Sequence, residues 1–133
     1  ITLSDEMLLS DISRLLSPVP IGIAAYGKLP LMLYRCCPVK NGKGCGECGG
    51  KSTITDRRGT VFPVQCRKNH SELLNSVPVW LADRLSELKA LDFLTLYFTD
   101  ETAEQAEKII NAYTRGGNAP EKYTRGLYYR GVY

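Results

Sequence analysis

Hydrophobic residues in the first third of the chain follow one helical and two strand-like patterns. Apolar residues recur at intervals of three and four over residues 5–16, which predicts an amphipathic helix that ends before Pro18. The apolar run over residues 21–26 predicts a buried strand, and a helix followed by a buried strand favours an α/β fold. Residues 31–35 predict a second strand.

The middle of the chain predicts a glycine-rich loop and a hairpin. Five of the ten residues over 41–50 are glycine, which indicates a loop. Residues 52–56 and 60–65 are strand-like, and Gly59 between them suits a turn, because glycine adopts backbone conformations that other residues avoid. We therefore expect an antiparallel hairpin that ends at Cys66.

The second half of the chain alternates between strand and helix patterns. The expected segments are a strand at 72–76, a helix at 78–89, a strand at 93–98 and a helix at 102–113. The last helix is expected to turn Ala106, Ile109 and Ile110 inward. Residues 116–133 are rich in Tyr, Arg and Gly without periodicity, and predict an extended tail that packs on its own domain or on a neighbour.

Length and composition predict one folded domain. The chain has 133 residues, 44% hydrophobic and 23% charged, which is typical of a globular protein. Its net charge of +3 does not specify a nucleic-acid partner, although Arg57, Arg58, Arg67 and Lys68 fall close together. No apolar stretch reaches the roughly 20 residues of a membrane span, and no secretion signal is recognised. We expect no membrane association and a cytoplasmic location.

The cysteines carry the clearest chemical signal. All five lie between positions 36 and 66, and four of them have the spacing Cys37-x7-Cys45-x2-Cys48-x17-Cys66. Thiolates are soft ligands for zinc or iron–sulfur clusters, and this spacing does not separate the two. The alternatives are buried thiols or disulfides, but Cys45 and Cys48 lie among glycine and charged residues. Cys36 is the spare cysteine or a substitute ligand.

Several motifs resemble the C-terminal part of the U32 peptidase family, in its bacterial branch. They are YGKLPLML at 26–33, CP at 37–38, TDRRG at 55–59, FP at 62–63, LNSVP at 74–78, FTDE at 98–101 and TRGLYYRG at 124–131. The resemblance covers nearly the whole chain. It implies that residues 1–133 are the closing strands and helices of a longer TIM-barrel-like protein, with a cysteine-rich insertion at 36–66.

The same resemblance implies a cofactor. Characterised relatives hold an iron–sulfur cluster on four cysteines, which Cys37, Cys45, Cys48 and Cys66 match. This reverses the slight preference for zinc that thiolate chemistry alone gives, so a 4Fe–4S cluster is expected and zinc is the alternative. Some relatives have three residues, rather than two, between the second and third cysteine.

Three functions are open at this point. The family name implies a fragment of a collagenase-like peptidase, but His70 is the only histidine and no convincing nucleophile accompanies it. The relatives' chemistry implies iron–sulfur-dependent hydroxylation of RNA or of a quinone precursor. The third reading is a non-catalytic structural end of the barrel. Expected partners are the remainder of the longer chain, a protein or RNA substrate, and a second copy bound through open strand edges.

Overall fold

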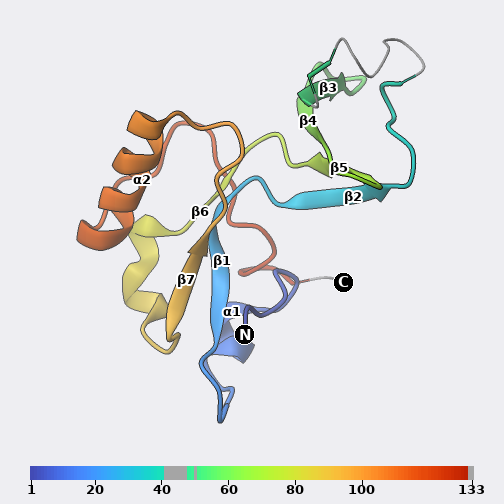
Figure 1. Cartoon of the computed structure of the whole chain (residues 1–133). Helices are drawn as coiled ribbons and strands as arrows, with labels where there is room; N and C mark the ends of the chain where they lie inside the picture. Colours follow the sequence, from blue (N-terminus) through green and yellow to red (C-terminus); the bar gives the residue numbers. More distant parts are fainter. Residues whose placement is uncertain (41–47, 50, 132–133) are drawn as a thin grey trace. The chain divides into compact units, whose positions relative to one another are not determined.

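The computed structural model describes residues 1–40, 48–49 and 51–131, and the chain has a mixed α/β fold with two sheets (Figure 1). It divides into two compact units. The main unit comprises Ile1–Gly27 and Val77–Tyr133, and the inserted unit comprises Lys28–Ser76. The inserted unit contains the whole segment that the sequence predicts as a cysteine-rich insertion. In the described part of the chain, no helix is long and apolar enough to cross a membrane.

A three-stranded sheet forms the centre of the main unit, in the order β6-β1-β7. Strand β1 (Gly22–Gly27) pairs in parallel with β7 (Phe93–Leu96) and antiparallel with β6 (Val79–Trp80). Every residue of β1 is buried, which explains its uninterrupted apolar sequence. The buried strand predicted at 21–26 is therefore confirmed.

Glycine at the start of β1 permits the close pairing with β7. A Cβ atom placed on Gly22 would lie 2.3 Å from the carbonyl oxygen of Phe93, so only glycine fits without a shift of the backbone. Thr2 forms a parallel bridge with the same residue, Gly22. The N-terminal residues thus add a further parallel segment next to β1.

The first predicted helix is wrong in its length. The pattern over residues 5–16 predicts a helix of three turns, whereas α1 spans only Leu9–Ile12. Leu9 and Ile12 are buried, but Leu15 is 42% and Leu16 100% exposed. A short helix is stable mainly through its packed face, so the helix ends where packing ends.

The helix predicted at 78–89 is also wrong in its first part. Val79 and Trp80 form the short strand β6, because they pair with the end of β1. The 3-10 helix η1 (Ala82–Leu88) follows it. Pairing with a distant strand therefore overrides the local helical pattern.

Helix α2 (Ala103–Arg115) confirms the last predicted helix. Thr102 caps its first turn, and the side chain of Gln105 completes a capping box. Ile109 packs against a core cluster formed by Tyr26, Trp80 and Ala82. Ile110 is 46% exposed, so its predicted inward orientation is wrong.

The C-terminal residues pack on their own unit. Thr124 forms a parallel bridge with Val79. Tyr128 is 1% exposed, and its hydroxyl donates a 2.9 Å hydrogen bond to the carbonyl oxygen of Ala24 in β1. The tail is therefore part of the core of the main unit, which agrees with the prediction that it packs on its own domain.

A four-stranded antiparallel sheet, in the order β2-β5-β4-β3, forms the inserted unit. Its strands are β2 (Pro30–Tyr34), β3 (Lys51–Thr55), β4 (Val61–Cys66) and β5 (Ser71–Leu74). Strands β3 and β4 form the predicted hairpin, and the Asp56 side chain accepts hydrogen bonds from the amides of Arg58 and Thr60 in its turn. Most of the predicted loop at 41–50 lies outside the described residues.

Candidate metal centre

The register of the inserted sheet brings its cysteines to one end. Ser71, at the start of β5, pairs with Tyr34 on one side and with Cys66 on the other. Cys37 follows shortly after Tyr34, so it lies at the same end as Cys66. Cys48 shortly precedes β3, whose first residue pairs next to the end of β4. Strand pairing therefore gathers cysteines that are far apart in the sequence.

Two of the four predicted ligands are in direct contact. The Sγ atoms of Cys37 and Cys66 are 4.0 Å apart, and the Cys66 thiol is the donor. The hydroxyl oxygen of Ser71 lies 3.9 Å from Cys66 Sγ. None of the four described cysteines, which include Cys36 and Cys48, forms a disulfide.

The surroundings of Cys37 favour its thiolate. The backbone amide of Val39 lowers the pKa of the Cys37 thiol, and the Cys66 thiol, the Ser71 hydroxyl and the amide of Lys40 act in the same direction. Amides that point at a sulfur are common where thiolates bind metals or clusters. The turn after β2 thus stabilises the thiolate form of Cys37.

The pKa of Cys66 shifts in the opposite direction to that of Cys37. Burial raises the pKa of the Cys66 thiol, and the nearby sulfurs of Cys37 and Cys48 raise it further. The hydrogen bond with the Ser71 hydroxyl acts in the opposite direction and lowers this pKa. The electrostatic effect of the Cys48 sulfur also indicates that Cys48 lies near the pair.

Cys36 and Cys37 occupy different surroundings. Cys36 is exposed, whereas Cys37 is partly buried and contacts Cys66. The structure therefore brings together Cys37 and Cys66, with Cys48 nearby, and leaves Cys36 outside the contact. Cys45 lies outside the described residues. Among residues 1–40, 48–49 and 51–131, no group of three His, Cys, Asp or Glu side chains is arranged to hold a metal ion.

Ser71 is the residue of this site that the sequence pattern missed. The strand was expected to start at residue 72, one position too late to include it. The sequence feature that could have revealed it is the short connection of four residues between Cys66 and Ser71. In the structure the amide of Arg67 donates a 2.8 Å hydrogen bond to the carbonyl oxygen of His70 across this connection. A tight turn at this point makes Cys66 and Ser71 the first cross-strand pair.

His70 does not form a nucleophile–base pair with the neighbouring serine. Its Nε2 atom lies 3.3 Å from Glu72 Oε1, and its side chain is 44% exposed. Glu72 also accepts from Arg67, at 3.4 Å. The adjacent hydroxyl of Ser71 contacts Cys66 instead. This geometry offers no support for serine-type hydrolysis at His70.

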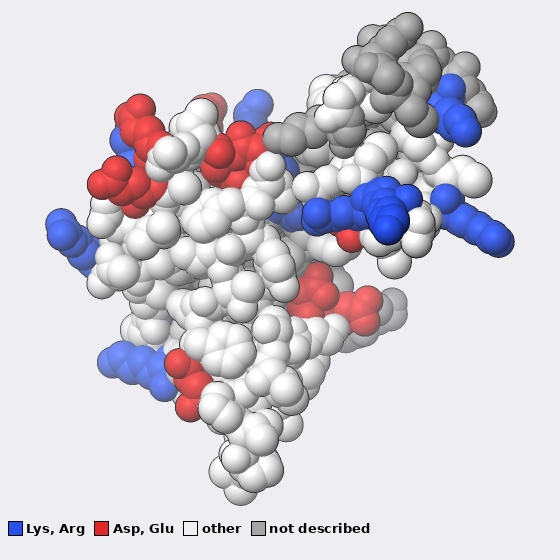
Figure 2. Space-filling view, viewed as in Figure 1, with Lys and Arg blue, Asp and Glu red and all other residues white. Residues whose placement is uncertain are grey.

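The inserted unit is strongly basic. Its 49 residues carry nine Lys and Arg against three Asp and Glu, and Figure 2 shows several basic side chains on its visible surface. The expected cluster is divided, because Arg57 and Arg58 lie in the turn of the hairpin whereas Arg67 and Lys68 follow the other end of β4. Six residues of strand separate the ends by about 20 Å. Of these four residues, Arg67 and Lys68 lie at the end of β4 that carries Cys66.

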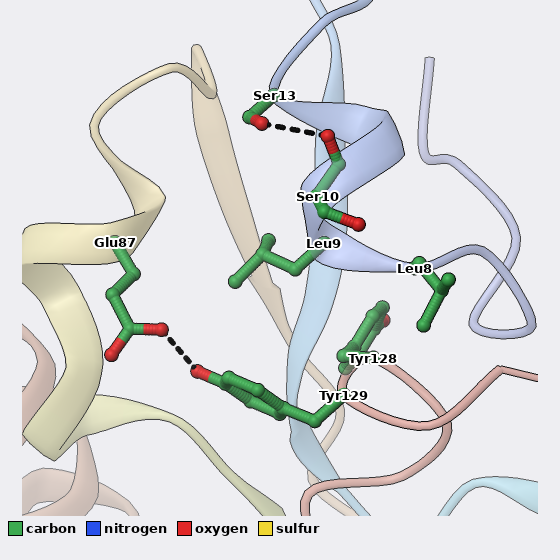
Figure 3. Close-up of a pocket in the computed structure, with 7 residues that line it drawn as sticks. All are labelled: Leu8, Leu9, Ser10, Ser13, Glu87, Tyr128 and Tyr129. Carbon is green, nitrogen blue, oxygen red and sulfur yellow. Dashed lines mark hydrogen bonds between the residues drawn. The ribbon is translucent and has the colours of Figure 1, made fainter.

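The main unit contains a cavity of about 340 Å³ (Figure 3). Its lining residues are Leu8, Leu9, Ser10, Ser13, Glu87, Tyr128 and Tyr129. Glu87 is its only acidic group, and both carboxylate oxygens are engaged, one by the Tyr129 hydroxyl at 2.8 Å and the other by Arg84 at 3.0 Å. The cavity therefore offers no free acid–base pair.

Comparison with protein-family models, with curated proteins and with solved structures gives no significant match.

Proposed function

We propose that Cys37, Cys45, Cys48 and Cys66 ligate one iron–sulfur cluster, in the C-terminal part of a protein similar to the U32 peptidases. The contact between Cys37 and Cys66, which are 29 residues apart in the sequence, is the observation that most directly supports a shared site for these cysteines. The preference for a cluster over zinc comes from the resemblance. Buried cysteines would be expected among apolar side chains, whereas these lie beside a hydroxyl, amides and a further cysteine.

The residues present suit a thiolate-bound centre. The pKa of Cys37 is lowered, which helps it to bind as a thiolate, and Cys66 would release its proton on binding, as thiol ligands do. The amides of Val39 and Lys40 would remain donors to the Cys37 sulfur. When bound, an iron–sulfur cluster supplies one-electron redox chemistry, and hydrogen bonds to its sulfurs adjust its potential.

A single zinc ion is the second candidate, and the sulfur separation favours it. Two thiolates bound at about 2.3 Å to one tetrahedral ion lie roughly 3.8 Å apart. The observed 4.0 Å is close to that value. In a 4Fe–4S cluster each thiolate binds a different iron, so the two sulfurs would have to move further apart.

The strand arrangement of the main unit supports the proposed origin as the end of a barrel. β1 is parallel to β7, and Thr2 is parallel to the start of β1. Successive parallel strands joined by longer segments are what a TIM-barrel-like fold requires. We propose that these segments are neighbouring strands of such a barrel.

We assign a collagenase-like peptidase activity to the longer protein only through its resemblance. Modification of RNA or of a quinone precursor is the alternative, and the basic charge of the inserted unit favours an anionic partner such as RNA. For this chain alone, a non-catalytic structural role fits the absence of a serine–histidine pair at His70.

Metal analysis of the purified chain tests the proposal. The full chain would be purified without oxygen, and its iron, acid-labile sulfide and zinc would be measured together with the visible absorption spectrum. We expect iron and sulfide in equal amounts with visible absorption. One zinc per chain without sulfide would establish the second candidate, and a metal-free chain with oxidised cysteines would overturn both.

A further inference from the structure

Ser71 is buried, which is unusual for a residue with a polar side chain. It is 3% exposed and, aromatic residues aside, it is the one buried residue in the described chain with a polar side chain. A buried hydroxyl is costly unless it is hydrogen-bonded. The Ser71 hydroxyl contacts a sulfur, Sγ of Cys66.

The sheet fixes Ser71 beside Cys66. It starts the inner strand β5, with Tyr34 of β2 on one side and Cys66 of β4 on the other. Its Oγ atom lies 3.9 Å from Cys66 Sγ, and its hydroxyl lowers the pKa of the Cys37 thiol. Backbone pairing on both sides therefore holds the hydroxyl beside the Cys66 sulfur.

Metal binding at Cys66 would determine which atom donates in the hydrogen bond between Ser71 and Cys66. The Cys66 thiol donates to Cys37, and in the contact between Cys66 and Ser71 either atom can be the donor. A metal-bound cysteine has lost its proton, so its sulfur only accepts. The Ser71 hydroxyl then becomes the donor.

We propose that Ser71 is a positioning residue that donates its hydroxyl hydrogen to the metal-bound thiolate of Cys66 and thereby strengthens metal binding. This inference rests on the proposed function. Such a bond withdraws electron density from the sulfur and fixes its orientation, and loss of a comparable outer-shell partner typically weakens metal binding about 10- to 100-fold.

Cobalt(II) titration of the full chain tests the proposal. Cobalt would be added without oxygen, in competition with a chelator, to the wild type and to Ser71→Ala. We expect the variant to bind cobalt about 10- to 100-fold more weakly. Its sulfur-to-cobalt charge-transfer band should move to lower energy, because a thiolate without the hydrogen bond gives up an electron more easily. A purely structural role would not move this band.

Two further comparisons control for folding. Ser71→Thr and Ser71→Val have nearly the same shape, but only threonine keeps the hydroxyl, so the threonine variant should bind more tightly than the valine variant. Ser52→Ala removes a hydroxyl from β3 of the same sheet and should leave binding unchanged.

The outcomes separate this inference from the proposed function. A wild-type chain that binds neither cobalt nor an iron–sulfur cluster would overturn the proposed function and this inference with it. Suppose instead that the wild type binds cobalt. If Ser71→Ala then has the same cobalt affinity and charge-transfer band as the wild type, or if Ser71→Val has the same affinity and band as Ser71→Thr, the inference alone is wrong.

Discussion

Arg125 holds Asp83 through two parallel hydrogen bonds, from Nη1 to Oδ1 at 2.6 Å and from Nη2 to Oδ2 at 2.7 Å. Nη1 also donates to the carbonyl oxygen of Trp80, at 2.7 Å. The guanidinium therefore fastens the C-terminal residues to β6 and η1 within the main unit. The planar fork of arginine matches a carboxylate in a way that lysine does not.

Arg125→Lys should destabilise the main unit. Lysine cannot keep both bonds to Asp83 and the bond to Trp80, so we expect a loss of about 1 to 3 kcal/mol in the free energy of unfolding. Urea denaturation monitored by tryptophan fluorescence measures it. The control is Lys108→Ala, because Lys108 pairs with Glu104 on an exposed helix face and should contribute less than about 0.5 kcal/mol. Equal losses in the two variants would contradict the assignment.

Asp83 should also make stability depend on pH. The hydrogen bonds from Arg125 hold the pKa of the Asp83 carboxyl below its ordinary value. The stabilisation from its ionised form is therefore present above the ordinary aspartate pKa of about 3.9, and is lost as the pH falls through the lower folded-state pKa. Between about pH 5 and pH 2 the wild type should lose more stability than Asp83→Asn. Parallel stability curves for the two proteins would show that this pair does not contribute.

The buried hydroxyl of Tyr128 provides a test of the packed tail. Tyr128→Phe removes its bond to the Ala24 carbonyl and should cost about 1 to 2 kcal/mol. Tyr128→Ala also removes the ring and should cost about 3 to 5 kcal/mol. Tyr129→Phe is the control, because Tyr129 is 45% exposed, and its effect should stay within about 0.5 kcal/mol. Thermal and urea unfolding measure all three, and a neutral Tyr128→Ala would mean that the tail is not packed.

Sequence patterns were most reliable where the structure depends on local chemistry. The turn of the β3–β4 hairpin uses the Asp56 side chain and the left-handed conformation of Gly59, both recognisable from neighbouring residues. The start of α2 uses a threonine and a glutamine three residues apart. Such signals need no knowledge of distant contacts.

Sequence patterns predicted the wrong secondary structure where contacts with distant parts of the chain determine it. The sequence pattern predicts that Val79 and Trp80 start a helix, but they form a strand because they pair with β1. Leu15 and Leu16 continue a helical pattern without a surface to pack on. The candidate site lies between these cases. The cysteine spacing predicted four candidate ligands, but only the strand register shows why Cys66 meets Cys37 and why Ser71 lies beside Cys66.

Strand β2 should promote association of the chain. It is an edge strand of the inserted sheet, and its residues Leu31, Met32 and Leu33 are 53%, 55% and 70% exposed. An apolar edge with unpaired backbone groups recruits another strand, from a second copy or from the remainder of a longer protein. We expect sedimentation velocity to show concentration-dependent association of the wild type.

Leu33→Lys should reduce that association, because a charge on an edge strand opposes pairing. Leu16→Lys is the matched control, since Leu16 is fully exposed outside any strand. A monodisperse monomer at high concentration would rule out the edge as an association surface, and an equal effect of both lysines would assign the association to general hydrophobicity.

Replacement of single cysteines should separate ligands from the spare thiol. Cys37→Ser and Cys66→Ser each remove one member of the contacting pair, and Cys48→Ser removes the cysteine next to them. Serine binds soft metals poorly, so each variant should lose most of its bound metal after anaerobic preparation. Cys45→Ser is expected to do the same.

Cys36→Ser is the matched control, because Cys36 is exposed and lies outside the Cys37–Cys66 contact, and it should keep the metal content of the wild type. Iron and zinc per chain, measured by elemental analysis, give the readout. Equal metal retention in all five variants would refute the ligand assignment, and loss in Cys36→Ser together with retention in Cys37→Ser would exchange the roles of these two neighbours.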